Sequence, residues 1–255
     1  MRQDDRLPFV EALRRAREAA YEPGEYVEQE SFMRASEIRE LAERAGVAPG
    51  VSVLDLCCGP GRYSVELAKM GYQVTGVDRT RPYLDKARDL AATYNASVEF
   101  VEDDMRHFVR PAAFDAALSL FTSFGYFEDP EDDRRVLRNL CASLRPGGRL
   151  AVDVTGKETL ARIYTPRDWM EFADGALLLF DREVEPGWNT VWNRWLFLKG
   201  GDKFEFKFTH RIYSSDSLAR ELTDAGFIVE GIYGGLDGSP YNREAKRLVA
   251  VAAKP

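Results

Sequence analysis

The sequence has few of the residues from which metal centres and disulfide frameworks are built. Its 255 residues include three cysteines and two histidines. The cysteines are Cys57, Cys58 and Cys141, and this low, odd count is typical of thiols that stay reduced. No CxxC or HxxxH cluster accompanies them, so we predict no metal site. The neighbouring Cys57 and Cys58 are expected to act as small apolar fillers at the end of a strand.

Long apolar runs and an excess of positive charge are also missing. Without a window of about 18 apolar residues, the sequence predicts no transmembrane helix. Acidic residues near its start leave no apolar core for a secretory signal. The net charge of -7 and the pI of about 5.1 argue against nucleic-acid binding, which needs clustered Lys and Arg. We therefore expect a cytoplasmic protein that binds neither nucleic acid nor membrane.

A repeated order of strand and helix is present between residues 51 and 154. Short apolar runs occupy 51–57, 73–78, 98–104, 114–121 and 146–154, with helical patterns at 62–71, 81–95 and 129–145. This alternation predicts a parallel sheet with right-handed crossovers. The apolar residues are nearly continuous within each strand, as expected for strands covered on both faces. The expected fold class is α/β, with a doubly wound, mostly parallel sheet.

The pattern changes after residue 165. Alternating residues at 176–185, 190–199 and 203–213 predict an antiparallel meander with one wet face, in which the phenylalanines of the last strand share the apolar side. A helix at 214–226 and strands at 227–234 and 246–253 follow. We accordingly predict four parts: an N-terminal helical lid (1–50, with helices at 8–20 and 30–46), a ligand-binding core (51–165), an antiparallel β insert on the substrate side (166–213) and a completion of the core sheet (214–255).

The segment VLDLCCGPGRYS, Val53 to Ser64, contains the strongest functional signal. A strand, a Gly-x-Gly turn and a helix predict a ligand site at the carboxyl end of the sheet. Dinucleotide loops carry a third glycine, where this sequence has Ser64. Asp55, inside the strand, would repel a pyrophosphate but suits a ligand with ammonium and sulfonium groups. The loop therefore favours a cationic ligand over a dinucleotide.

Acidic residues also end the next two predicted strands. Asp78 stands where a carboxylate can accept both hydroxyls of a ribose. Asp104 ends the third strand, where it can accept from an adenine amino group, with the amide of Met105 beside it. Three acids at three successive strand ends predict one shared site for an adenosyl ligand.

These residues together resemble the class I S-adenosylmethionine-dependent methyltransferases. The matching segments are VLDLCCGPGRYS, VTGVD, EDDMR, FDAALSLFTSFGYF and LRPGGRLAVDV, which cover about residues 51–154. The tail looks like a bacterial small-molecule branch of that family. The resemblance implies a seven-stranded, Rossmann-like sheet whose last strand is antiparallel, a place that 246–253 fits. It also implies S-adenosylmethionine as the cofactor.

The resemblance assigns cofactor roles to eight residues. Gly59 and Gly61 would flank the methionine part, Asp55 would support its amino group, Asp78 would hold the ribose, Asp104 and Met105 would read adenine, Arg79 would lie along the adenine face, and Phe121 would line the pocket near the methyl group. Since the cofactor carries its own electrophile, the protein has mainly to position the acceptor and exclude water. No catalytic residue is therefore assigned, and whether a general base is used stays open.

The acceptor is expected to be a small molecule, bound by the parts grafted around the sheet. The candidates for its binding are Tyr21, Tyr26, Phe32, Trp169, Arg211, Tyr213 and Tyr241. Each aromatic residue of the insert has core filling as its alternative role, and the insert is also a possible homodimer contact. Two other functions stay open at this point: a nicotinamide-dependent oxidoreductase on a similar fold, and a non-catalytic cofactor-binding or assembly protein.

Overall fold

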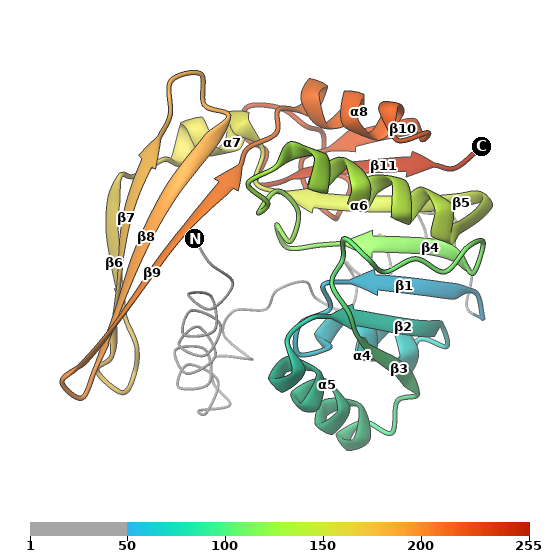
Figure 1. Ribbon diagram of the computed structural model, residues 1–255, viewed down its shortest axis with the longest axis horizontal. Helices are drawn as coiled ribbons and strands as arrows, with labels where there is room; N and C mark the ends of the chain where they lie inside the picture. The colour runs from blue at the N-terminus through green and yellow to red at the C-terminus, as the bar shows by residue number, and fades with distance from the viewer. Residues whose placement is uncertain (1–49) are drawn as a thin grey trace. The chain divides into compact units, whose positions relative to one another are not determined.

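The computed structural model describes residues 50–255, which form two compact units (Figure 1). The core unit comprises residues 50–162 and 213–255, and the β insert comprises residues 163–212. The helices expected at 8–20 and 30–46, and with them the N-terminal lid, lie outside the described residues. Within the described part, no helix is both long and apolar enough to cross a membrane.

The core unit is built on a seven-stranded sheet with the order β10-β11-β5-β4-β1-β2-β3. Its strands are β1 (Ser52–Leu56), β2 (Gln73–Asp78), β3 (Val98–Glu102), β4 (Phe114–Ser119), β5 (Leu144–Val154), β10 (Ile228–Tyr233) and β11 (Leu248–Ala253). β1 to β5 pair in parallel, whereas β11 is antiparallel to both of its neighbours. This confirms the predicted mostly parallel sheet with an antiparallel last strand. The chain leaves β1 for β2 on one side and reaches β4 on the other, so the topological switch point lies at β1.

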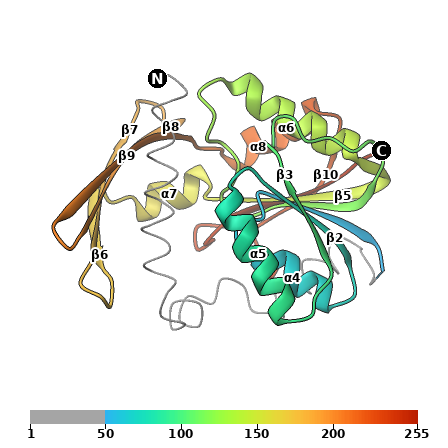
Figure 2. The same ribbon diagram turned by 60° about the horizontal axis from the view of Figure 1, so that its bottom comes forward.

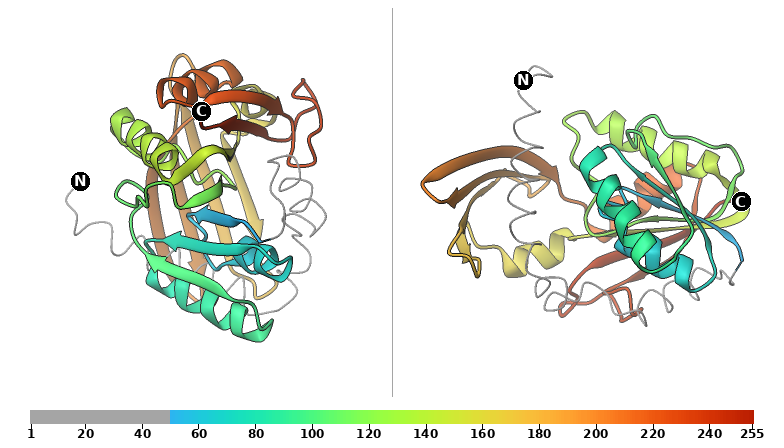
Figure 3. Two further views of the ribbon diagram at one scale, coloured as in Figure 1. Left: turned by 90° about the vertical axis from the view of Figure 1, so that its right-hand side faces the viewer. Right: turned by 90° about the horizontal axis from the view of Figure 1, so that it is seen from below.

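Helices cover both faces of this sheet (Figures 2 and 3). They are α4 (Arg62–Lys69), α5 (Arg81–Thr93), α6 (Pro130–Ser143) and α8 (Ser215–Asp224), while α7 (Lys157–Ile163) follows β5. Side chains alternate along β1, so Leu54 and Leu56 pack with residues of α6 and α8, while Val53 packs with residues of α4. The same alternation turns Asp55 toward α4, and this orientation determines its surroundings.

The β insert is a four-stranded antiparallel sheet in the order β6-β7-β8-β9. Its strands are β6 (Arg167–Glu171), β7 (Leu177–Val184), β8 (Thr190–Lys199) and β9 (Asp202–Arg211). Three of them were predicted. β6 was not, because RDWME lacks an alternation of apolar residues. Phe197 and Phe206 form the buried centre of one face, and Trp195 and Phe204 pack against it, which confirms the apolar side predicted for the last strand.

Candidate functional site

The loop between β1 and α4 has a backbone that few side chains allow. Cys57, Gly59 and Gly61 all have positive φ, at 65°, 55° and 78°. A Cβ on Gly61 would lie 2.7 Å from the Cβ of Ala87 in α5, so this glycine permits close packing of the loop. A Cβ on Gly59 would meet nothing within 4 Å. The backbone at Gly59 therefore borders open space, whereas Gly61 is held against the protein.

Asp55 is the most deeply buried acid of the three. Its side chain is 2% exposed, and its Oδ2 accepts a hydrogen bond from the Ser64 hydroxyl at 2.6 Å. Burial raises the pKa of Asp55 to about 6, with a further contribution from the charge of Asp78. Ser64, singled out in the sequence only as the missing third glycine, is thus the partner of Asp55. A carboxylate in such surroundings gains from a cationic ligand that restores its charge.

Asp78 joins the end of β2 to the glycine loop. Its Oδ2 accepts a hydrogen bond from the Gly59 amide at 3.0 Å, and its Oδ1 accepts one from the Thr80 amide at 2.8 Å. Each carboxylate oxygen has two lone pairs, so these amides leave further acceptor sites. The carboxylate is thereby held in one orientation beside the open backbone of Gly59.

Asp104 is held mainly by Arg106. Its Oδ1 accepts from the Arg106 amide and Nε, both at 2.9 Å, and its Oδ2 accepts from Arg106 Nη2 at 2.7 Å. Burial acts to raise the pKa of Asp104, but these hydrogen bonds and the charge of Arg106 outweigh it and lower the pKa to about 2. Arg79 Nη1 lies 4.0 Å from Asp104 Oδ2. Asp104 is therefore a fixed anion between two arginines.

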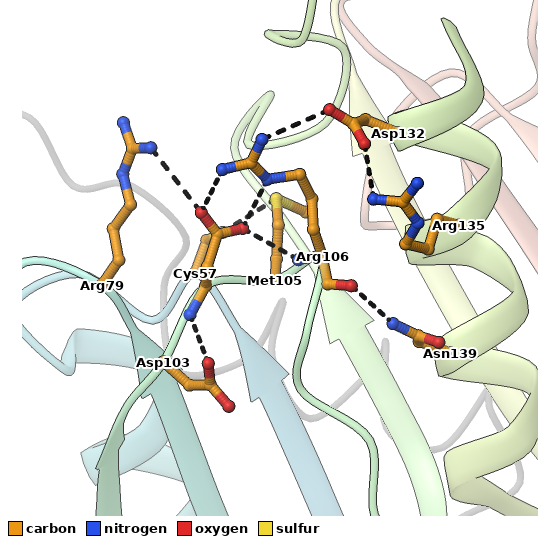
Figure 4. A network of polar contacts seen from close by, with 9 residues as sticks. Cys57, Arg79, Asp103, Met105, Arg106, Asp132, Arg135 and Asn139 are labelled. Atoms are coloured by element: carbon orange, nitrogen blue, oxygen red, sulfur yellow. Dashed lines mark hydrogen bonds and ion pairs between the residues drawn. The ribbon is translucent and has the colours of Figure 1, made fainter. Parts of the chain in front are cut away.

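Arg106 also connects this acid to α6, as Figure 4 shows. Its Nη1 lies 3.3 Å from Asp132 Oδ2, and Asp132 Oδ1 accepts from Arg135 at 2.8 Å. The Asn139 amide group donates to the Arg106 carbonyl at 2.9 Å. The segment after β3 is thus anchored to a helix, which keeps Asp104 in place.

The charges of the three acids all act on one residue, Cys57. Burial raises the pKa of its thiol, and the charges of Asp78, Asp55 and Asp104 all raise it further. The protonated thiol donates to the Met105 sulfur at 3.5 Å. The Gly59 amide of the β1–α4 loop donates to Asp78 at the end of β2, and Arg79 beside it lies 4.0 Å from Asp104 after β3, so the three strand ends are linked. The cysteine itself is a protonated thiol rather than a nucleophile.

The carboxyl end of β4 contains a second unusual backbone. Phe121 and Thr122 are consecutive residues with φ of 59° and 58°, and Phe121 is 42% exposed. Asp153, which is 1% exposed in β5, accepts from the Phe121 amide at 2.8 Å through Oδ2, while its carbonyl accepts from the Thr122 amide at 2.9 Å. The neighbouring strand thus holds the Phe121–Thr122 corner.

Arg247 completes this cluster just before β11. It donates to both carboxylate oxygens of Asp153, at 2.6 and 3.0 Å, and to the Thr122 hydroxyl at 2.6 Å. The guanidinium also lies 5.6 Å from the centre of the Phe121 ring. Sequence reasoning missed both Asp153 and Arg247. Asp153 interrupts the apolar run LAVDV in the way that Asp55 interrupts VLDL, so the same signal was available for it.

The predicted acceptor-binding residues fall into three groups. Tyr21, Tyr26 and Phe32 lie outside the described residues. Trp169, which is 62% exposed in β6, and Arg211, at the end of β9, belong to the β insert.

Tyr213 and Tyr241 belong to the core unit. The hydroxyl of Tyr241 donates to Glu158 Oε2 at 2.6 Å, and burial and this acid raise its pKa. Tyr213 is 4% exposed and donates to Asp133 at 2.9 Å. Tyr213 therefore lies in the core. Tyr241 is joined to Glu158, an acid that follows β5 by four residues and that the sequence analysis did not select.

Residues 53–148 match the family model described as a methyltransferase domain. This part of the chain is a class I S-adenosylmethionine-dependent methyltransferase domain. Its family cofactor is S-adenosylmethionine, as the resemblance implied. This finding sets aside the nicotinamide-dependent oxidoreductase and the non-catalytic protein. No group of His, Cys, Asp or Glu in residues 50–255 is arranged to hold a metal ion.

The methyltransferase is similar to proteins from several bacteria. YqeM of Bacillus subtilis (strain 168), a protein named as a methyltransferase, is 24% identical over 216 residues, which are 79% of this chain and 83% of that one. The fold resembles that of an S-adenosylmethionine-dependent methyltransferase from Clostridium acetobutylicum ATCC 824 (TM-score 0.75, 15% identity, 86% of this chain and 90% of that one). It also resembles the sugar N-methyltransferase KedS8 from Streptoalloteichus sp ATCC 53650 (TM-score 0.69, 19% identity, 92% of each chain).

Proposed function

We propose that this methyltransferase moves the methyl group of S-adenosylmethionine to a small-molecule acceptor by in-line displacement. The observation that supports this most directly is the placement of the three acids: Asp55 is buried in β1, Asp78 accepts from the Gly59 amide of the following loop, and Asp104 lies 4.0 Å from Arg79. These acids fit a cofactor that carries an ammonium group, a ribose diol and an adenine. The bound cofactor supplies a methyl group on a positively charged sulfur.

The binding roles follow from the surroundings of each acid. Asp55, buried with a raised pKa, pairs with the ammonium group of the methionine part. Asp78 accepts from the ribose hydroxyls with the lone pairs that the two amides leave. Asp104 and the Met105 amide read adenine, and the guanidinium of Arg79 lies along its face.

The backbone and the Phe121 corner complete the proposed site. The open backbone at Gly59 lets the methionine part approach, and Gly61 keeps the loop packed on α5. Phe121 presents its exposed ring near the methyl group, where it excludes water from the reacting atoms.

An amino compound is the acceptor class that we would test first. Tyr241 and Glu158 form a phenol–carboxylate pair after β5, where strand ends of an α/β sheet bind ligands. A carboxylate that accepts from a tyrosine retains lone pairs for an ammonium or amino group. The printed name of KedS8, a sugar N-methyltransferase, describes such an acceptor. A neutral amine attacks without losing a proton first, so this chemistry needs no general base.

The other residues expected to bind the acceptor, and the expected homodimer, stay predictions. Trp169, Arg211 and Tyr213 are still assigned to acceptor binding by the sequence alone, although the buried Tyr213 fits a core role better. A homodimer contact through the β insert likewise stays a prediction, and light scattering of the purified chain would measure it.

The proposed function is tested by following release of S-adenosylhomocysteine in the presence of acceptors. A panel of small amines, alcohols and phenols of graded size would be offered with the cofactor. We expect turnover with at least one amine and a rate that depends on its concentration. If no compound of the panel raises the release of S-adenosylhomocysteine above the rate measured without an acceptor, and the cofactor still binds tightly, the result would contradict a small-molecule acceptor but not the cofactor site. A Glu158→Gln variant with unchanged KM for that amine would exclude Glu158 from its binding.

A further inference from the structure

The Phe121–Thr122 corner has a backbone conformation that is costly for both of its residues. Two consecutive non-glycine residues with φ near 60° are rare, and threonine, being β-branched, is among the residues least suited to that region. Such strain persists only where the surroundings impose it, and it gathers at functional sites. Turn formation alone does not explain this conformation, because glycine would adopt it at a lower cost.

The surroundings that impose this conformation are polar, with Asp153 buried and Arg247 partly buried. Asp153 fixes the Phe121 amide, and Arg247 fixes the Thr122 hydroxyl while pairing with Asp153. The Thr122 hydroxyl in turn accepts from the Thr155 amide at 3.2 Å. A buried ion pair is weak evidence for stability, because removing two charges from water costs about as much as their attraction returns. The hydrogen bonds that Asp153 and Arg247 make to the corner instead indicate that this pair positions Phe121 and Thr122.

The cluster lies beside the proposed cofactor loop. Asp55 of β1 pairs with Leu118 of β4, and Ser119 of β4 pairs with Val152 of β5, so the ends of these three strands are neighbours in the sheet. The corner follows β4, and Asp153 precedes the end of β5, so both stand at the carboxyl edge of the sheet. The ring that the cluster holds, that of Phe121, is exposed at this edge.

We propose that Asp153 and Arg247 are positioning residues for methyl transfer. They hold the Phe121–Thr122 corner in its strained conformation, and the corner presents the Phe121 ring to the reacting end of the cofactor and acceptor. This inference rests on the proposed function. It predicts that the pair contributes to turnover much more than to cofactor binding, since the acids that bind the cofactor follow β1, β2 and β3.

The first test replaces Arg247 and separates turnover from binding. In Arg247→Met we expect kcat to fall about 10- to 100-fold, as misplacement of a group near reacting atoms does. The Kd for S-adenosylmethionine, measured by calorimetry, should stay within about 3-fold. Arg247→Lys, which keeps the charge but not the planar fork, should give an intermediate kcat. An equal loss of cofactor affinity and turnover would overturn the positioning role.

A second test uses the free protein and needs no turnover. The Phe121 amide donates to Asp153, so its hydrogen exchange should be slow in the wild type and faster in Arg247→Met. If Arg247→Met does not fold, Thr122→Val removes the hydroxyl that Arg247 binds while keeping the shape of the side chain. Thr122→Ser keeps the hydroxyl and is the matched control. Equal kcat in the Val and Ser variants would contradict the proposal.

A third test separates positioning from stability. Thr122→Gly relieves the strained φ but also removes the hydroxyl that Arg247 and the Thr155 amide bind, so the two effects on the melting temperature oppose each other while kcat falls. Ala112, with φ of 49° in an exposed loop, offers a matched control, since Ala112→Gly relieves similar strain away from the site. We expect Ala112→Gly to keep full kcat. Full activity in Thr122→Gly would overturn the inference, whereas a wild type that binds no cofactor would overturn the proposed function instead.

Discussion

The hydroxyl of Ser64 donates to the buried carboxylate of Asp55 at 2.6 Å, across the junction of β1 and α4. A dinucleotide loop would carry a glycine at residue 64. Here the serine and the acid form one unit, and Gly76 in β2 leaves them room, because a Cβ there would lie 2.9 Å from the Ser64 Oγ. Both Ser64 and Gly76 thus accommodate the buried carboxylate of Asp55 at the switch point of the sheet.

Cofactor binding should depend on pH through Asp55. Burial raises the pKa of this acid to about 6 from an ordinary 3.8. An ammonium group binds the ionised form, so affinity for S-adenosylmethionine should fall about 10-fold between pH 7 and pH 5. Calorimetry at several pH values measures this change. The same slope in Asp55→Asn would assign it to another group.

The same acid should affect the stability of the free protein in the opposite sense. Because the pKa of Asp55 is higher in the folded than in the unfolded chain, its contribution favours folding fully below about pH 4 and is lost as the pH rises through 6. We expect the stability difference between Asp55→Asn and wild type to grow over this range in favour of the variant. Urea unfolding at pH 4 and pH 7 tests this, and a difference that does not change with pH would contradict it.

Removing Arg106 should disturb the adenine end of the site. In Arg106→Met, Asp104 loses the two hydrogen bonds from the Arg106 side chain and keeps the one from the backbone amide of residue 106, so its pKa should rise from about 2 toward its ordinary value. We expect a loss of about 1–3 kcal/mol in unfolding free energy and weaker cofactor binding. Arg135→Met, which removes an exposed partner of Asp132, is the control and should cost at most about 1 kcal/mol. Equal effects of the two substitutions would show that Arg106 is an ordinary surface arginine.

The two glycines of the loop should differ in what they support. Gly61→Ala places a Cβ against Ala87 at a positive φ, so it should cost about 2–4 kcal/mol of stability. Gly59→Ala meets no neighbour and should cost about 1 kcal/mol, yet it should weaken cofactor binding. Chemical unfolding and calorimetry on both variants separate the two roles. A stable Gly61→Ala protein would mean that the loop and α5 are not closely packed.

Tyr213 offers a test between an acceptor role and a core role. Its hydroxyl donates to buried Asp133, and its ring stacks on Phe124 with centres 5.3 Å apart. Tyr213→Phe should therefore lower the unfolding free energy by about 1–3 kcal/mol and leave the KM for the acceptor unchanged. A raised KM without a loss of stability would restore the acceptor role that the sequence suggested.

The sheet and the three acids were predictable because they depend on local patterns. An apolar strand, a glycine turn or a helical period can each be recognised within a stretch of about 20 residues, and the acids stand at or near the ends of those strands. Arg247 could not be found this way, because its partner Asp153 is 94 residues away and an arginine before a strand is common. Similarly, Tyr213 follows a strand rich in aromatic residues, where the sequence does not show whether its hydroxyl faces a ligand or the core. Only the structure shows that this hydroxyl donates to the buried Asp133 of α6.

The most direct measurement of the central claim is calorimetric titration of S-adenosylmethionine into wild type, Asp78→Ala and Asp85→Ala. Asp85 is an exposed acid of α5 that pairs with Arg88, so its removal is a control for the loss of one charge. The account predicts binding to the wild type, an affinity about 100-fold weaker in Asp78→Ala, equivalent to roughly 3 kcal/mol, and no change in Asp85→Ala. Binding of equal strength in all three proteins, or no binding to the wild type, would contradict it.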